Sequence, residues 1–246
     1  MNATNTSHKG SHFFYKTNGS EFFIRGVCYQ DNGHFVFDSD SFIDPLGDGP
    51  TCARDVPYLV KLGVNVVRAY AVDPTIDHSE CMAELAAAGI YVVTGLGGGK
   101  SANINGSDPS WDYDLYQRYT AVIDSFQNYT NVLGFFAGNE VALTTDTTAA
   151  MAFAKAAVRD TKAYIRQKGY RDIPVGYATS NSLEIRIQLA DYLNCGDAND
   201  TADFQGLNVY SWCGNATLES SGYTDLIAEY QNYSVPVFLS EYGKQS

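Results

Sequence analysis

Residues 132–140 read VLGFFAGNE, an apolar run that ends in Asn139 and Glu140. Residues 235–241 read VPVFLSE, and here the carboxylate of Glu241 follows directly after the apolar run. Nearly continuous apolarity over a short run is typical of parallel strands that are buried on both faces. Both segments therefore predict central strands of one sheet, each with a carboxylate at its carboxyl end.

Similar runs recur along the chain, and longer amphipathic stretches separate them. The predicted strands cover residues 22–29, 64–71, 90–96, 132–138, 173–178, 204–210 and 235–241. The predicted helices cover residues 54–62, 79–88, 113–129, 147–168, 183–193 and 224–230. Gly169 directly follows the clearest helix, where a left-handed cap is expected. Strand and helix alternate throughout, and this alternation predicts a parallel sheet.

Two parallel-sheet folds fit this pattern, a doubly wound sheet and a barrel. The first predicted strand is followed by Gln30-Asp31-Asn32-Gly33 rather than by the glycine-rich turn of a dinucleotide binder, and residues 95–100 (GLGGGK) lack the spacing of a phosphate loop. We therefore predict an α/β fold, a (β/α)8 TIM barrel that is apparently truncated after the seventh strand. Residues 1–20 are expected to form an N-terminal polar extension, and residues 21–246 a catalytic barrel domain that is incomplete at its C-terminus.

Composition narrows the possible functions. The chain has 246 residues, 45% of them hydrophobic, so it can bury a large core. A net charge of −12 repels nucleic-acid phosphates and anionic bilayers, and no apolar run is long enough to span a membrane. The four histidines are scattered and no Cys-x-x-Cys motif occurs, so we expect no metal and no cofactor.

Motifs for N-linked glycosylation are unusually frequent. The pattern N-x-S/T occurs eight times, whereas about two occurrences are expected by chance from the Asn, Ser and Thr content. The eight motifs begin at Asn2, Asn5, Asn18, Asn105, Asn128, Asn199, Asn215 and Asn232. The first ten residues carry no apolar segment of a secretory signal. The excess nevertheless favours passage through a glycosylating, oxidising compartment, where Cys52 and Cys81 are candidates for a disulfide.

In a barrel, catalytic groups lie at the carboxyl ends of the strands. Glu140 and Glu241 are both placed there, and two carboxylates across one cavity are the minimal apparatus for cleaving a glycosidic bond with a general acid and a nucleophile. Arg68 and Tyr70 end the second strand, where an arginine could keep a nucleophilic carboxylate ionised. Tyr210 and Trp212 end the sixth, and their rings could hold sugar faces; packing in the core or rim is the alternative for each aromatic residue.

The strand ends at 139–140 and 240–243 resemble the acid/base and nucleophile motifs of retaining glycosidases. More closely, the chain from about Phe22 to Gly243 resembles the fungal β-1,3-glucanosyltransferases of glycoside hydrolase family 72, the Gas, Gel and Phr type. The segments that carry this resemblance are FIRGV (23–27), DHSECM (77–82), YTNVLGFFAGNEV (129–141), IPVGY (173–177) and YSWCG (210–214).

This resemblance implies an enzyme that cuts an internal β-1,3-glucan bond through a covalent glycosyl-enzyme and transfers the glycan to another glucan in fungal cell-wall assembly. Its expected partners are a β-1,3-glucan donor and a β-1,3-glucan acceptor, and no binding of nucleic acid is expected. Glu140 is implied as the acid/base and Glu241 as the nucleophile, with their carboxyl groups about 5–5.5 Å apart. Substrate binding is implied for Gln30, Tyr70, Asn139, Tyr210 and Tyr242. Cys52 and Cys81 match a family disulfide.

Members of the family are usually secreted and held at the cell surface by a glycosylphosphatidylinositol anchor. The signal for this anchor is absent from the sequence. Contact with a membrane is therefore expected only through the lipid anchor of the full-length form. The sequence also departs from the family pattern. Gly95 stands where the family typically has an aspartate, and Lys244 where it has a cysteine, which leaves Cys213 without its expected partner; Cys195 also lacks one. Two alternatives therefore stay open: an endo-β-1,3-glucanase, or a catalytically dead glucan-binding fragment.

Overall fold

A parallel sheet of seven strands forms the centre of the molecule. The structure is a computed structural model that describes residues 6–30 and 42–243. The strands lie in the order β10-β9-β8-β7-β6-β5-β4, and each neighbouring pair is parallel. They are β4 (Gly26–Cys28), β5 (Val66–Ala69), β6 (Tyr91–Gly95), β7 (Val132–Asn139), β8 (Val175–Ser180), β9 (Gln205–Val209) and β10 (Val237–Tyr242). Each overlaps a predicted strand, although the predicted strand 22–29 also includes Phe22, which belongs to β3 (Glu21–Phe22).

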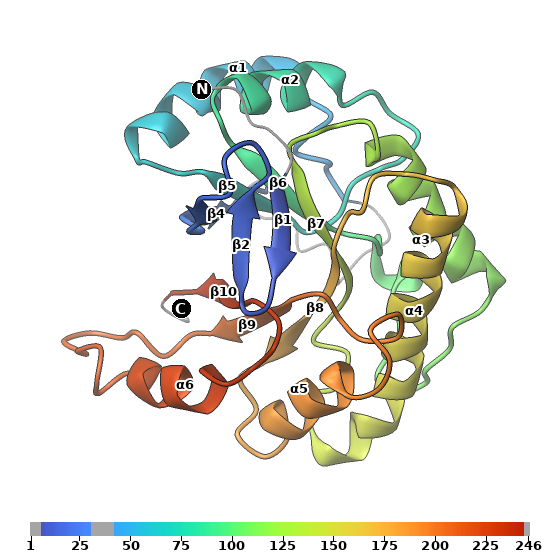
Figure 1. Cartoon of the computed structure of the whole chain (residues 1–246), viewed down its shortest axis with the longest axis vertical. Helices are drawn as coiled ribbons and strands as arrows, with labels where there is room; N and C mark the ends of the chain where they lie inside the picture. Colours follow the sequence, from blue (N-terminus) through green and yellow to red (C-terminus); the bar gives the residue numbers. More distant parts are fainter. Residues whose placement is uncertain (1–5, 31–41, 244–246) are drawn as a thin grey trace.

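The sheet curves into a nearly closed barrel (Figure 1). Its first and last strands, β4 and β10, face each other across a cavity of about 830 Å³ that residues of both strands line. The barrel fold predicted from the sequence is confirmed. Spatial order follows chain order, and this brings the carboxyl ends of all seven strands to one end of the barrel.

One α-helix lies between each pair of consecutive strands and covers the outside of the barrel (Figure 1). The helices are α1 (Gly49–Lys61), α2 (Ser79–Ala87), α3 (Tyr113–Phe126), α4 (Met151–Gln167), α5 (Arg186–Asn194) and α6 (Tyr223–Tyr230), with short 3-10 helices η1 (Lys100–Ala102) and η2 (Thr145–Ala150). Helix α4 begins four residues later than the predicted helix 147–168, because η2 precedes it. Gly169 follows α4 with a φ of +67°, as the sequence predicts.

The described start of the chain, residues 6–22, packs against one end of the barrel. The stretch 1–20, placed outside the barrel from its sequence, contains β1 (Thr6–Lys9) and β2 (His12–Tyr15), which form an antiparallel sheet with β3 (Glu21–Phe22). The buried ring of Phe13 lies 6.1 Å from the ring of Phe204, just before β9, and 6.1 Å from that of Phe238, near the start of β10. This small sheet therefore covers the amino ends of the strands.

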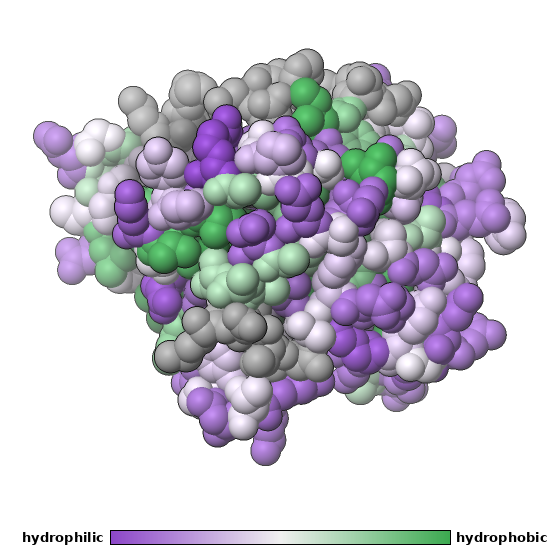
Figure 2. Space-filling view, turned by 90° about the horizontal axis from the view of Figure 1, so that it is seen from above, coloured by the Kyte–Doolittle hydropathy of each residue, from purple (hydrophilic) through white to green (hydrophobic). Residues whose placement is uncertain are grey.

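The barrel interior is closely packed at this end. Gly176 in β8 shows how closely, since a Cβ atom added there would lie 2.4 Å from the ring of Phe204. Outside the barrel, the predicted disulfide between Cys52 and Cys81 joins α1 to α2, with 5.3 Å between their Cα atoms. No helix within residues 6–30 and 42–243 is long and apolar enough to cross a bilayer. Seen from above, the surface is mostly hydrophilic, with smaller apolar groups between (Figure 2).

Candidate active site

Glu140 lies directly after β7, at the carboxyl end of the barrel. The pairing of β7 with β8 shifts register between Phe136 and Asn139, and Glu140 has a φ of +50°. A left-handed backbone costs a non-glycine residue free energy and occurs often at functional sites. Here the bulge and the left-handed turn bring two consecutive side chains, those of Asn139 and Glu140, to the same amide group, Nδ2 of Asn208, at 3.1 and 3.0 Å.

A second bulge positions Glu241. The pairing of β10 with β9 shifts register between Leu239 and Glu241, so that Ser240 and Glu241 also share one side of their strand. The hydroxyl of Ser240 donates to Oδ1 of Asn208 at 2.7 Å. Oε1 of Glu241 accepts from Nη1 of Arg68 at 2.8 Å, and Oε2 accepts from the hydroxyl of Tyr210. Both oxygens of this buried carboxylate are therefore satisfied.

Arg68 is the cation at the centre of the site. It projects from β5 across the barrel, and its side chain has a relative exposure of only 6%. Its Nη1 also donates to the carbonyl of Ser240 at 3.1 Å, and its Nη2 to Oδ1 of Asn139 at 2.8 Å. The guanidinium lies between the rings of Tyr70 and Phe136, 4.6 and 4.8 Å from their centroids. These contacts hold the positive charge against Glu241.

Asn208 in β9 connects the two carboxylates, and sequence reasoning missed it. Its Nδ2 donates to Oε1 of Glu140, and its Oδ1 accepts from Arg68 at 3.3 Å, while Arg68 binds Glu241. One asparagine and one arginine thus bridge the two strand ends. A polar residue inside the apolar run 204–210, two positions before Tyr210 and so on the same strand face, was the available signal.

The two carboxylates sit in different environments. Burial raises the pKa of Glu140 above its ordinary value, the hydrogen bond from Asn208 opposes that rise, and the negative charge of Glu241 adds to it. Glu241, in contrast, is paired directly with a guanidinium. Burial and the hydrogen bond to Glu241 raise the pKa of Tyr210, so this tyrosine is a neutral hydroxyl donor at neutral pH. A carboxyl group whose pKa is raised, beside one that is ion-paired to a guanidinium, suits acid-assisted attack on an acetal carbon.

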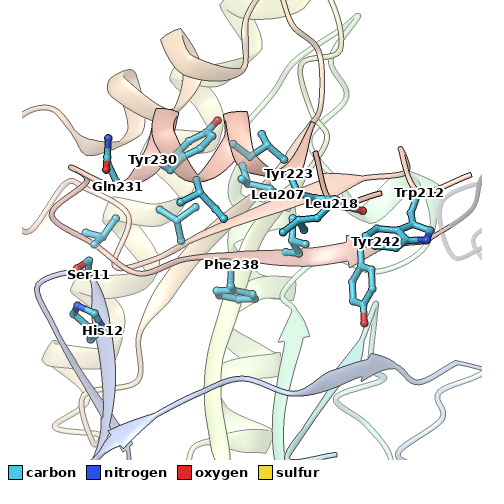
Figure 3. A pocket seen from close by; sticks show the side chains of 15 residues that line it. Ser11, His12, Leu207, Trp212, Leu218, Tyr223, Tyr230, Gln231, Phe238 and Tyr242 are labelled. Carbon is cyan, nitrogen blue, oxygen red and sulfur yellow. The ribbon is translucent and has the colours of Figure 1, made fainter. Parts of the chain in front are cut away.

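The remaining predicted residues divide into two groups. Tyr70 belongs to the site: its ring stacks on Arg68 and its hydroxyl lies 3.3 Å from Sγ of Cys28. Tyr242 lies beside the site, because it lines the 830 Å³ cavity between β4 and β10 together with Arg68 and Glu241. It is exposed and, with Trp212, lines an apolar hollow of about 620 Å³ over β9, β10 and α6 (Figure 3). Gln30 is exposed, two residues beyond the end of β4.

A cavity of about 410 Å³ opens on the Glu140 side of the site. Its walls come from residues 103–107, from the end of β7 and the residues just after it (138–141), and from Thr147. Gly95, at the position where the resemblance leads one to expect an aspartate, is close to the carbonyl of Tyr70: an added Cβ atom would lie 2.4 Å from that oxygen. The site here has no carboxylate at that place.

Cys28, Cys195 and Cys213 are free thiols in the described structure. Lys244, which stands where the family has a cysteine, lies outside the described residues. Burial raises the pKa of the Cys28 thiol beside Tyr70.

Comparison with known proteins identifies close relatives. A family model described as glucanosyltransferase matches residues 2–246. Protein EPD1 of Candida maltosa is 52% identical over 235 residues, which are 95% of this chain and 42% of that protein. The 1,3-beta-glucanosyltransferase gas1 of Schizosaccharomyces pombe is 50% identical over 238 residues, 95% of this chain and 43% of that protein. The chain thus spans less than half the length of these curated relatives.

Solved structures match as well. Gas2p of Saccharomyces cerevisiae, in a mutant form in complex with laminaritetraose and laminaripentaose, superposes with a TM-score of 0.92 at 43% identity, over 99% of this chain and 53% of that one. A crystal structure of the same enzyme with a small compound gives the same TM-score of 0.92 over 99% of this chain and 55% of the other.

Proposed function

Because the chain belongs to the glucanosyltransferase family, we propose that it forms the catalytic barrel of a retaining β-1,3-glucanosyltransferase, an enzyme that cleaves an internal β-1,3 linkage and transfers the glycan to another glucan. One observation carries this proposal: Arg68 and Asn208 join Glu241 to Glu140 at the carboxyl end of the barrel. The glucan oligosaccharides bound to Gas2p support the choice of substrate class.

In the first step, a carboxylate oxygen of Glu241 attacks the anomeric carbon of the donor glucan. The bond from that carbon to the linking oxygen breaks, and the leaving chain takes the proton of Glu140 and departs as an alcohol. The raised pKa of Glu140 suits this role, because the group must be protonated when the bond breaks. The product is a glycosyl ester on Glu241.

In the second step, Glu140 is ionised and acts as a base. It takes the proton from a hydroxyl of the acceptor glucan, whose oxygen attacks the anomeric carbon and releases Glu241. Two inversions at one carbon retain the β configuration. Transfer requires that a sugar hydroxyl react in place of water, so the site has to hold an acceptor sugar against the ester.

The neighbouring residues have distinct roles in this proposal. Arg68 and the hydroxyl of Tyr210 hold Glu241 in the orientation for attack, since each binds one of its oxygens. In this proposal Asn139, whose Oδ1 accepts from Arg68, binds the sugar 2-hydroxyl beside the scissile bond. The ring of Tyr70 and the exposed rings of Trp212 and Tyr242 offer apolar faces to glucan. Gln30, exposed beyond the end of β4, is proposed to line the substrate cleft.

Product sizing with a defined β-1,3-oligoglucoside tests the proposal. Products longer than the starting chain are expected, and only shorter ones would identify an endo-β-1,3-glucanase. Glu241→Gln should abolish turnover and leave glucan affinity largely intact, while Glu219→Gln, on an exposed glutamate, should behave as the parent. Glucan binding without turnover in the parent, and no change in Glu140→Gln, would indicate a catalytically dead binding fragment instead.

We further propose that the full-length form is secreted and held at the cell surface through a lipid anchor. Eight N-x-S/T motifs and the Cys52–Cys81 disulfide support an oxidising, glycosylating route. Cell fractionation that finds the full-length protein in the cytoplasm would contradict this location.

A further inference from the structure

The asparagines of the chain fall into two groups that differ in exposure. Every described asparagine that begins an N-x-S/T motif is exposed: Asn18, Asn105, Asn128, Asn199, Asn215 and Asn232. Every described asparagine outside such a motif is buried or half-buried: Asn65, Asn103, Asn131, Asn139, Asn181, Asn194 and Asn208. Asn2 and Asn5 lie outside the described residues. Random placement of the motifs would rarely give so complete a separation.

The two groups also use their amide nitrogens differently. Outside the motifs, Nδ2 is commonly a structural donor, as in the hydrogen bonds from Asn65 to the carbonyl of Phe23 at 2.8 Å and from Asn208 to Glu140. Inside the motifs, no hydrogen bond within the described part of the chain involves Nδ2. Asn18 and Asn105 use only Oδ1, which accepts from the backbone two residues later at 3.0 and 2.8 Å. Nδ2, the atom that an N-linked glycan occupies, stays available.

Asn105 differs from the other motif asparagines in its position, because it lines the 410 Å³ cavity that also contains Glu140. The loop that carries it is held close to the segment after β7. A Cβ atom added to Gly106 would lie 2.1 Å from the carbonyl oxygen of Val141, so this middle residue of the motif packs directly against that segment. A group attached to Asn105 would therefore stand at a fixed place on the rim of the catalytic cleft.

We propose that Asn105 carries an N-linked oligosaccharide that borders the cleft on the Glu140 side and restricts the entry of long glucan chains. In the attachment, Nδ2 forms a bond to the first sugar carbon of a lipid-pyrophosphate-linked oligosaccharide. The bond from that carbon to the pyrophosphate oxygen breaks, the pyrophosphate leaves with the electron pair, and the amide nitrogen loses one proton. The effect on glucan entry rests on the proposed function, whereas the attachment itself does not.

Peptide mass spectrometry of the protein secreted from a glycosylating host tests the attachment. Enzymatic release of N-glycans converts each modified asparagine to aspartate, and this change is expected at Asn105. Finding Asn105 unmodified while Asn128 is modified would overturn the proposal. Asn128 is the matched reference, because it is exposed and lies four residues before β7 begins, at the opposite end of the barrel from Glu140. This readout is independent of enzyme activity.

Three variants test the effect on the cleft. Ser107→Ala removes the motif at Asn105, Ser107→Thr changes the same side chain but keeps the motif, and Thr130→Ala removes the motif at Asn128. We expect a several-fold lower KM for long β-1,3-glucan in Ser107→Ala only, with little change for short oligosaccharides. Equal KM values in Ser107→Ala and Ser107→Thr would refute the role at the cleft. Glycan release from the folded parent should reproduce the effect of Ser107→Ala.

Discussion

Replacing Asn208 by alanine tests the link between the two carboxylates directly. The variant loses the hydrogen bond from Nδ2 to Glu140, and Oδ1 no longer accepts from Ser240 and Arg68. A hydrogen bond to a charged group contributes about 1.5–3 kcal/mol, and one pKa unit corresponds to about 1.4 kcal/mol. Because Glu140 is half-buried, water replaces part of the lost bond. We therefore expect the pKa of Glu140 to rise by about one unit.

The direction of this change is fixed by which form the bond stabilises. Asn208 donates to the ionised carboxylate and so lowers the pKa of Glu140; without it, the carboxyl group keeps its proton to higher pH. In the proposed mechanism Glu140 must be protonated in the first step, so the alkaline limb of the kcat/KM profile should move upward by about one pH unit. At the optimum, kcat/KM should fall about 10- to 100-fold, because Arg68 and Glu140 both lose their hydrogen bonds to Asn208.

The assay is transfer to a laminari-oligosaccharide acceptor, measured across pH for the parent and the variant. Asn194→Ala is the matched control: it removes a hydrogen bond from the same amide atom, here to the carbonyl of Ala190 at 2.9 Å, within α5 and outside the site. Its alkaline limb should stay in place. An alkaline limb that stays in place or moves to lower pH in Asn208→Ala would refute the assignment of Glu140 as the acid that Asn208 controls.

Two further predictions concern stability. Burial raises the pKa of Glu140, so the contribution of this group to stability is fully present below the ordinary glutamate pKa and is lost as the pH rises through the raised value. Glu140→Gln should therefore increase Tm at pH 7 but not at low pH. Equal gains in Tm at both pH values would contradict this. Phe13→Ala should lower the free energy of unfolding by about 3–5 kcal/mol, measured by heat or urea, because Phe13 closes the amino end of the barrel against Phe204 and Phe238. Phe14→Ala, at the half-buried neighbour, should lower it clearly less. Similar losses for the two variants would contradict this role of Phe13.

Much of the fold could be read from local patterns. In a barrel of alternating strands and helices, the strands are buried on both faces and the helices on one. Apolar runs therefore indicate the strands, and amphipathic stretches indicate the helices. The same patterns indicated where four polar side chains lie: in the structure Glu140 and Tyr210 directly follow β7 and β9, and Arg68 and Glu241 lie near the carboxyl ends of β5 and β10.

The polar start of the chain could not be interpreted in this way. The strands β1 and β2 are four residues each, too short to show a period, and Phe13 is buried only because the open end of the barrel needs a cover. The partners of Phe13, Phe204 and Phe238, lie far along the chain. No local property of residues 1–20 records that contact.

The amino-acid sequence by itself determined which residues end the strands and which chemistry they can perform. The tertiary structure alone decided how they meet. Asn208 and Arg68 are 140 residues apart, and the bulges before Glu140 and Glu241 turn consecutive side chains to one side, against the alternation that any strand pattern assumes. A sequence pattern records the burial of each residue, but a hydrogen bond depends on distance and direction between atoms, which only the closing of the barrel fixes.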